Sequence, residues 1–440
     1  MAAGALLDDL LRAAERPPGA DTVQFTGADP VLPSRFPLGE AGAATIAAAA
    51  LQAARLWQHR TGQTQQVSVD IDAAAAAMRS SRYLRIESPA DGTNPRPPRA
   101  GGGGLGIYPT ADGRWMYYQR LFPHHRARQA NVLQTAPDDE AAIAAATATW
   151  TGTELEDAIV ERGACAAMVR SADEWAAHGQ GRALATLPLF EVLRFGHSQP
   201  EPLPAADRPL GGIRVLDLTR VLAGPTCART LAEHGADVLR IGTLALPDNE
   251  AMMHDTGHGK RSAALDLTSA EGIARLRTLI GGADVFAQGY RPGSLASRGF
   301  GPLEVAALRP GIVYVTISAF GHTGPWRDRR GFDSVVQAAS GIADDSAIDG
   351  VPRFAPANPL DYMTGYLAAF GVMVALARRA EEGGSYLVRV SLAQTGRWLS
   401  SLPRLEPSLA AAEPADLPPE RLASLMMTTE TPFGRLRHLK

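Results

Sequence analysis

The stretch "IRVLDLTRVLAGPTCARTLAEHGADVLRI", residues 213–241, decides the fold that this sequence predicts. It opens with a short run of valine and leucine (213–219), continues as a helical segment (227–235), and closes with a second short apolar run (236–241). A strand, a helix and a strand in this order are typical of a parallel sheet covered by helices. The turn that leaves the first strand, "VLAGPTC" (221–227), consists largely of small residues, so a ligand can approach the backbone there.

The same alternation continues toward the C-terminus. We predict a helix over 269–282, strands over 283–288 and 311–320, and a helix over 359–380. The predicted fold class is therefore α/β. Because ligands bind at the carboxyl ends of the strands in such sheets, we expect the turns that leave these strands to form the site.

The composition is that of an ordinary soluble protein. Of 440 residues, 45% are hydrophobic and 20% are charged, and the net charge of −3 gives no strong attraction to nucleic acid or to a membrane. Cys165 and Cys227 provide neither a disulfide framework nor metal-ligand spacing. The N-terminal stretch carries acids within its apolar run, unlike a signal peptide, and no uninterrupted apolar run reaches membrane-spanning length. We expect a cytoplasmic protein with no metal, no nucleic-acid partner and no membrane partner.

A proline-rich segment divides the chain into two predicted domains. "HSQPEPLPAADRPLGG", residues 197–212, has few apolar side chains and is typical of a linker. The regular pattern is lost again after about residue 403. We therefore predict an N-terminal domain over 1–196, the linker, a larger domain with the sheet over 213–402, and a C-terminal tail over 403–440.

Two segments far apart in the sequence are similar to each other. Residues 37–80 align with residues 358–401 at a constant offset of 321, and each contains a small-residue helix, a glycine turn, a Val-x-Val strand and a second helix. The alignment places Glu40 opposite Asp361, and a slip of one residue would place Gly39 there instead. A partial duplication explains the shared order of elements, whereas chance agreement between two alanine-rich segments is the alternative.

Asp361 is the one acid at the start of the apolar helix "NPLDYMTGYLAAFGVMVALA" (358–377). Aspartate is a preferred N-cap residue, because its carboxylate accepts a free backbone N–H of the first helical turn. The other interpretation is a nucleophile held at a helix N-terminus beside a bound ligand. From this stretch alone the cap is the more common explanation.

Cationic and aromatic residues also occur beside the predicted strands. Lys260 and Arg261 precede a short strand and suit a phosphate group, although an adjacent cation pair is more often solvated surface. After the strand at 283–288, Tyr290 can stack on a base and Arg291 can bind phosphate. Together these residues indicate a large phosphorylated ligand.

Four consecutive glycines precede an apparent hairpin: Gly101, Gly102, Gly103 and Gly104. Polyglycine is common in flexible linkers. It is equally suited to a mobile flap, because its backbone N–H groups can close over a ligand. The sequence leaves both interpretations open.

The motifs taken together are similar to one known family. After the opening stretch come "GKRSAALDL", "ADVFAQGYRPGSL", "ISAFGHTGP", "GFDSVVQAASG" and "PLDYMTGYLAAFGVMVAL". This order resembles that of the family III CoA-transferases, which include the alpha-methylacyl-CoA racemases, over about 212–400. The resemblance implies a Rossmann-like parallel sheet in the large domain and a second, smaller α+β domain. The segment "GIYPTADGRWMYY" resembles the smaller lobe of that family, so the N-terminal domain looks like a small lobe joined to a degenerate copy of the helix.

The resemblance also implies a chemistry and a set of contacts. Asp361 falls on the aspartate that attacks an acyl-CoA thioester, which gives an aspartyl anhydride, then an aspartyl-CoA thioester, and finally transfer of CoA to a carboxylic acid. The glycine-rich flap of the family matches 101–104. Positions that match the family's CoA contacts are Val221, Leu222, Ala223, Lys260, Gly289, Tyr290 and Arg291.

Three departures from the family pattern keep alternatives open. Gly242 and Thr243 stand where the family has an acid and an arginine, and Phe332 stands where the racemases have a histidine. The small-lobe block comes first in this chain. We therefore expect a CoA-transferase acting on acyl-CoA and a carboxylic acid, with a racemase-like isomerase and a non-catalytic CoA-binding homologue as alternatives. Its assembly is either an interlocked homodimer or an internal pseudo-dimer.

Overall fold

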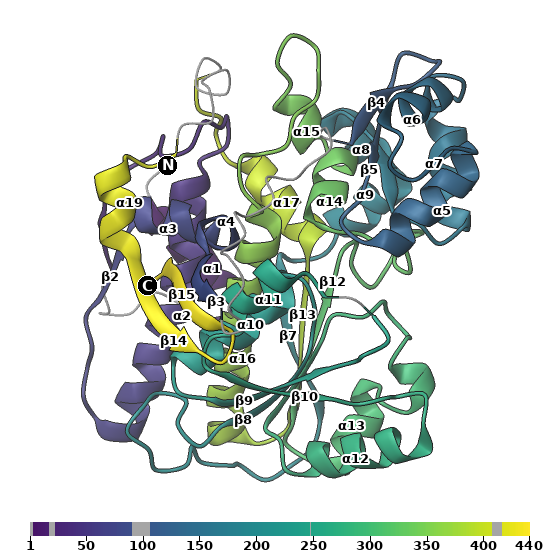
Figure 1. Cartoon of the computed structure of the whole chain (residues 1–440). Helices are drawn as coiled ribbons and strands as arrows, with labels where there is room; N and C mark the ends of the chain where they lie inside the picture. Colours follow the sequence, from purple (N-terminus) through teal and green to yellow (C-terminus); the bar gives the residue numbers. More distant parts are fainter. Residues whose placement is uncertain (1–2, 17–22, 90–105, 247, 407–415) are drawn as a thin grey trace.

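The computed structural model describes residues 3–16, 23–89, 106–246, 248–406 and 416–440 (Figure 1). Its centre is a seven-stranded sheet with the order β10-β9-β8-β11-β12-β13-β7. All neighbours in it are parallel except β13 and β7, which are antiparallel. The α/β class predicted from the sequence is confirmed. In sheet order the strands are β10 (Lys260–Ala264), β9 (Asp237–Gly242), β8 (Arg214–Leu218), β11 (Val285–Gln288), β12 (Val313–Ser318), β13 (Ser385–Ser391) and β7 (Phe190–Gly196).

Helices cover both faces of this sheet because alternate residues of each strand point to opposite faces. Val215 lies in one core with α10 (Ala223–Glu233) and α16 (Pro359–Glu382). Its neighbour Leu216 lies in a second core with α12 (Ala270–Gly281) and α13 (Pro302–Leu308). Short apolar strands buried on both faces are what the opening stretch predicts.

The remaining elements lie around this sheet or form smaller units. The other helices are α1 (Ala3–Ala13), α2 (Leu38–Thr61), α3 (Ile71–Ala77), α4 (Ser80–Tyr83), α5 (Pro123–Leu133), α6 (Glu140–Thr147), α7 (Gly152–Glu161), α8 (Ala172–Ala177), α9 (Gly179–Ala185), α11 (Glu250–Thr256), η1 (Ala296–Arg298), α14 (Asp333–Ala339), α15 (Ile342–Asp345), α17 (Leu392–Ser401) and α19 (Pro419–Leu425).

A small domain, defined here as residues 106–185, has a core of its own. Its antiparallel sheet consists of β4 (Ile107–Pro109), β5 (Trp115–Tyr118) and β6 (Ala166–Met168). Side chains of β5 and of α7, including Met116, are buried together between this sheet and the helices. The helices α5, α6 and α7 gather around the sheet in the upper right of Figure 1.

The internal repeat is present in the structure. Both α2 and α16 contain 24 residues, and their first and last residues are each separated by the same offset of 321. The two helices pack against each other, and each is followed by a strand and a further helix that begins at Ile71 or Leu392. The N-terminal copy forms a two-stranded parallel sheet from β1 (Val23–Thr26) and β2 (Val67–Asp70), as β12 and β13 pair in the C-terminal copy.

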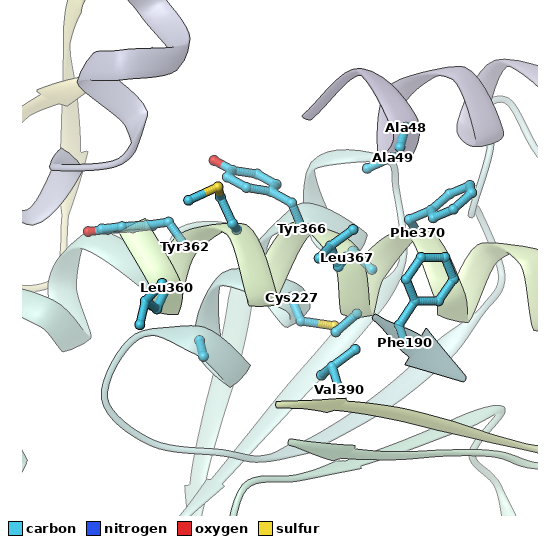
Figure 2. Close-up of a cluster of buried hydrophobic side chains, with 14 of the residues drawn as sticks. Ala48, Ala49, Phe190, Cys227, Leu360, Tyr362, Tyr366, Leu367, Phe370 and Val390 are labelled. Carbon is cyan, nitrogen blue, oxygen red and sulfur yellow. The ribbon is translucent and has the colours of Figure 1, made fainter. Parts of the chain in front are cut away.

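The helix α16 is the centre of the core. It is long and apolar enough to cross a membrane, yet the whole of its apolar window is buried inside the fold. Figure 2 shows Ala48 and Ala49 of α2 on one side of it, with Cys227 of α10 and Val390 of β13 toward the sheet. Gly365 allows α10 to approach closely, because a Cβ there would lie 2.5 Å from the backbone oxygen of Ala223.

Two segments extend beyond the boundaries predicted from the sequence. The strand β7 lies within the predicted N-terminal domain, yet it forms an edge of the large sheet by pairing with β13. The predicted tail contains α19 and a hairpin of β14 (Met426–Thr431) and β15 (Gly434–Leu439), and β15 pairs with β3 (Arg85–Pro89). Both differences arise because strands pair with strands that are distant in the sequence, and a local sequence pattern does not predict such pairing.

Candidate active site

A cavity of 560 Å³ lies at the carboxyl ends of the parallel strands. The turns after β8, β9, β11 and β12 all contribute residues to its wall, as a parallel sheet predicts. The contributing residues include Thr219, Arg220, Val221, Ala245, Leu246, Gly289, Tyr290, Arg291, Pro292, Ser294 and Ala319.

A further part of the cavity wall comes from the small domain. Phe122, His124, His125 and Arg128 lie on α5 or immediately before it, and all line the cavity. The loop after β12 supplies further lining residues, namely Arg327, Arg329, Arg330, Gly331 and Phe332. Residues from both halves of the chain therefore enclose one site.

Asp361 lies in the first turn of α16, is 6% exposed and lines the cavity. It does not cap its helix. The backbone N–H of Asp361 donates to Oδ2 of Asp333 at 3.0 Å, so the cap is the carboxylate of Asp333 at the start of α14. Within the described residues no hydrogen bond reaches the Asp361 carboxylate itself. The Asp361 carboxylate is therefore not the cap of its own helix, and it lines the cavity instead.

Burial raises the pKa of both carboxylates of this pair. Burial raises the pKa of Asp361 well above its usual range, and the neighbouring Asp333 carboxylate raises it further. Burial also raises the pKa of Asp333 to about 6, although hydrogen bonds from the Asp361 N–H and the Gln337 side chain oppose the shift. A carboxylate with a raised pKa is more basic, and so a better nucleophile once it is ionised. The helix N-terminus favours that ionised form.

Positive charge without a matching carboxylate surrounds the rest of the cavity. Arg128, Arg291 and Arg330 line it, and none of them forms an ion pair within the described part of the chain. Burial lowers the pKa of Arg330, and the like charges of Arg291 and Arg128 lower it further. By contrast, Arg329 in the same wall pairs with Glu156 at 3.0 Å. A cluster of unmatched arginines is stabilised when an anion binds among them.

The structure brings most of the predicted site residues together. Val221, Ala223, Gly289, Tyr290 and Arg291 line the same cavity as Asp361. Val221 has a φ of 73°, which is rare for a β-branched residue and strains the backbone in the turn that lines the cavity. Gly101, Gly102, Gly103 and Gly104 lie outside the described residues.

Three predicted contact residues do not line the cavity. Leu222 is fully buried where α10 begins. The ammonium of Lys260 lies 2.9 Å from Oδ2 of Asp217, and both side chains are turned into the interior, where they are 1% and 0% exposed. Arg261 lies on the exposed edge strand β10 and pairs with Asp237. The sequence predicted that Lys260 contacts a ligand because a cation stood beside a strand. In the fold, Lys260 instead forms a buried ion pair with Asp217.

Several residues of the site were not singled out from the sequence. Asp333 stands in the quoted motif "GFDSVVQAASG", but only the fold shows that it reaches the N-terminus of α16. Arg128 and His125 belong to a helix whose pattern carries no functional signal. Arg330 precedes the same motif, and its charge beside a glycine is the one local signal that points to it.

Comparison with known proteins identifies the family. Residues 19–191 and 210–423 match the model of CoA-transferase family III. An acetyl-coenzyme A transferase of Hypoxylon pulicicidum is 36% identical over 249 residues, which are 53% of this chain and 42% of that protein. The beta subunit of a succinyl-CoA–L-malate CoA-transferase of Chloroflexus aurantiacus is 35% identical over 197 residues, which are 41% of this chain and 48% of that protein.

A crystal structure of a CAIB/BAIF family protein from Brucella suis is 29% identical and covers 45% of this chain and 56% of that chain, with a TM-score of 0.40. The chain spans about half the length of the curated relatives it matches. Since the family's model matches most of its residues, the chain belongs to CoA-transferase family III.

Proposed function

We propose that this chain transfers CoA from an acyl-CoA donor to a carboxylic acid acceptor, with Asp361 as the nucleophile. One observation carries the proposal: the Asp361 carboxylate lines the cavity without a partner among the described residues, and it is the one acid among the described residues that form the wall. A buried carboxylate retained without a cation is expensive, and such groups are enriched at catalytic sites.

The cationic part of the cavity supports CoA as the shared ligand. Arg128, Arg291 and Arg330 suit the phosphates of CoA, since guanidinium groups bind phosphate through paired N–H donors. Tyr290 is in the same wall and can stack on the adenine ring. Lys260 takes no part in this proposal, because its charge is already paired with Asp217.

The reaction balances without a metal or a redox step. An Asp361 oxygen attacks the thioester carbonyl, the C–S bond breaks, and CoA leaves as a thiolate. The thiolate attacks the aspartyl carbonyl of the anhydride and releases the donor acid, which leaves aspartyl-CoA. The acceptor carboxylate then attacks this thioester, and the thiolate attacks the acyl carbonyl of the second anhydride. Acyl-CoA forms, and Asp361 is regenerated.

Residues of both halves of one chain surround the cavity, which supports an internal pseudo-dimer over a homodimer that shares its sites. The small domain supplies Arg128, and the C-terminal half supplies Asp361. Succinyl-CoA and L-malate are named for a relative, so short acyl-CoA donors and carboxylic acids are the substrates to test first.

Trapping with hydroxylamine tests the proposal. Protein incubated with acetyl-CoA or succinyl-CoA and hydroxylamine should carry a hydroxamate at Asp361, detected by mass spectrometry of peptides. Asp361→Asn should abolish both this adduct and CoA transfer. Glu40→Gln is the matched control, because Glu40 occupies the equivalent position of the N-terminal copy outside the cavity wall, and it should change neither. CoA binding without an adduct would contradict the transferase proposal, as would deuterium exchange at the acyl α-carbon without transfer.

A further inference from the structure

His125 is a buried histidine that lines the same cavity as the proposed nucleophile. It lies in the first turn of α5 and is 3% exposed, yet it is among the residues that line the cavity. Its ring meets the ring of Phe332 edge to face, with 5.8 Å between the centroids. Phe332 directly precedes Asp333, whose carboxylate holds the backbone of Asp361. Phe332 therefore links the His125 ring to the pair of acids Asp333 and Asp361.

The two ring nitrogens of His125 are in different environments. Nδ1 is enclosed and has no hydrogen-bond partner within the described residues, whereas Nε2 is not enclosed in this way. A neutral imidazole carries one proton, on one of its nitrogens. A proton on Nδ1 would bury an unpaired N–H, so the tautomer with the proton on Nε2 is the more stable one. The N–H donor is then on the nitrogen that a ligand can reach.

His125 is neutral at physiological pH. Burial lowers its pKa to about 4, and the positive charges of His124, Arg330 and Arg128 contribute to the shift. A neutral imidazole donates a hydrogen bond but does not transfer its proton to a CoA thiolate. It also forms no ion pair with a carboxylate, so it leaves the charge of Asp361 available for attack.

We propose that His125 donates a hydrogen bond from Nε2–H to the acyl carbonyl oxygen of the bound thioester. The inference rests on the proposed transferase function. When Asp361 attacks, the carbonyl π electrons move to this oxygen, and the hydrogen bond stabilises the oxyanion that develops. The C–S bond then breaks as the carbonyl re-forms, and His125 retains its proton throughout. The same hydrogen bond from His125 stabilises the oxyanion in each later attack on an acyl carbon that occupies this position.

Two substitutions separate this role from simple packing. His125→Leu fills the space without a donor, and His125→Gln places an amide N–H near the position of Nε2. Loss of one oxyanion donor lowers kcat by about a hundredfold or more, with little change in KM. We expect this for His125→Leu and recovery of at least tenfold of the loss in His125→Gln. His234→Leu is the control, because burial also lowers the pKa of His234 to about 4 but this residue lies at the end of α10.

Spectroscopy tests the contact even if a variant does not fold. Infrared spectra of acyl-CoA labelled with ¹³C at the thioester carbonyl, bound to Asp361→Asn protein, should show a lowered carbonyl frequency that returns toward the solution value with His125→Leu. Nitrogen NMR of the wild-type protein should show the Nε2–H tautomer of His125 at pH 7. A folded His125→Leu protein with kcat within threefold of wild type would overturn the inference, as would an Nδ1–H tautomer. Absence of the Asp361 hydroxamate in wild-type protein is the distinct result that removes the proposed function itself.

Discussion

The Asp333 carboxylate accepts the backbone N–H of Asp361, with 3.0 Å between Oδ2 and the nitrogen. The N-terminal copy repeats this relationship, because Oδ2 of Asp29 accepts the backbone N–H of Glu40 at 2.7 Å. An acid from a preceding segment thus caps both long helices, and a second acid occupies the first turn of each. The capping is common to both copies, whereas only the C-terminal acid faces the cavity.

Asp333→Asn should move the pH dependence of the proposed reaction. The charge of Asp333 raises the pKa of Asp361, so its removal lowers that pKa. We expect the acid limb of the kcat/KM profile to shift by roughly one unit toward lower pH. Steady-state rates between pH 4.5 and 8 measure this shift. Asp29→Asn, the equivalent change in the N-terminal copy, should leave the profile unchanged.

The same substitution should change how stability depends on pH. The pKa of Asp333 in the folded state is raised to about 6 from 3.8, so the folded protein binds more protons than the unfolded chain between these values. Stability is therefore lost as pH rises from about 4 to about 6. Urea unfolding at several pH values should show that Asp333→Asn lacks this contribution. Equal pH slopes for the variant and the wild type would contradict it.

Lys260→Met should destabilise the fold rather than weaken binding of CoA. The substitution leaves the Asp217 carboxylate buried without its cation, which costs about 3–5 kcal/mol. Its neighbour Arg261 forms an exposed pair with Asp237, so Arg261→Ala should cost less than about 1 kcal/mol. Denaturant unfolding gives both values. A higher KM for acyl-CoA in a Lys260→Met protein of normal stability would instead assign Lys260 to the ligand.

Gly365→Ala tests the close approach of α10 and α16. The new Cβ would lie 2.5 Å from the carbonyl oxygen of Ala223 and 2.7 Å from Cβ of Thr226, and neither the backbone nor a Cβ can rotate away. We expect a loss of about 1–3 kcal/mol and lower activity, because Ala223 also lines the cavity. Gly4→Ala in α1 is the control: a Cβ at Gly4 meets nothing within 4 Å, so this change should not destabilise.

Arg330→Gln should weaken binding of acyl-CoA without lowering the stability of the ligand-free protein. Removal of one charged hydrogen bond to phosphate is worth about 1.5–3 kcal/mol, or at least a tenfold rise in KM. Because the like charges of Arg128 and Arg291 already oppose the Arg330 charge, the ligand-free variant should be at least as stable as wild type. Thermal melting with and without CoA checks both statements. Arg275→Gln, on the exposed face of α12, is the control and should leave CoA binding unchanged.

The sequence predicted the sheet because its signals are local. The strands β8, β11 and β12 lie within the ranges that hydrophobic patterning assigned, β9 ends one residue beyond its range, and α16 begins at the predicted residue. Convergence of the strand-end turns on one cavity then follows from the parallel order. The hydrophobic pattern within a segment is enough to predict these strands and this helix, because each of them buries its own apolar side chains.

What the sequence did not predict depends on contacts between distant segments. The sequence pattern of "FEVLRFG" does not reveal that β7 pairs with β13, and an aspartate in a "GFD" motif does not reveal that it caps another helix. Lys260 is the reverse case: its charge indicated a ligand, and only the fold supplies Asp217 as its partner. The side of α5 that carries His125 is likewise set by how the small domain packs.

The position of β7 has a practical consequence for dividing this protein. Because β7 covers one edge of the sheet, a fragment that begins at the proline-rich segment would leave the backbone N–H and C=O groups of β13 unpaired along a mostly apolar strand. Open edges of this kind recruit strands from other molecules and lead to aggregation. Soluble fragments are therefore expected only when they begin before Phe190.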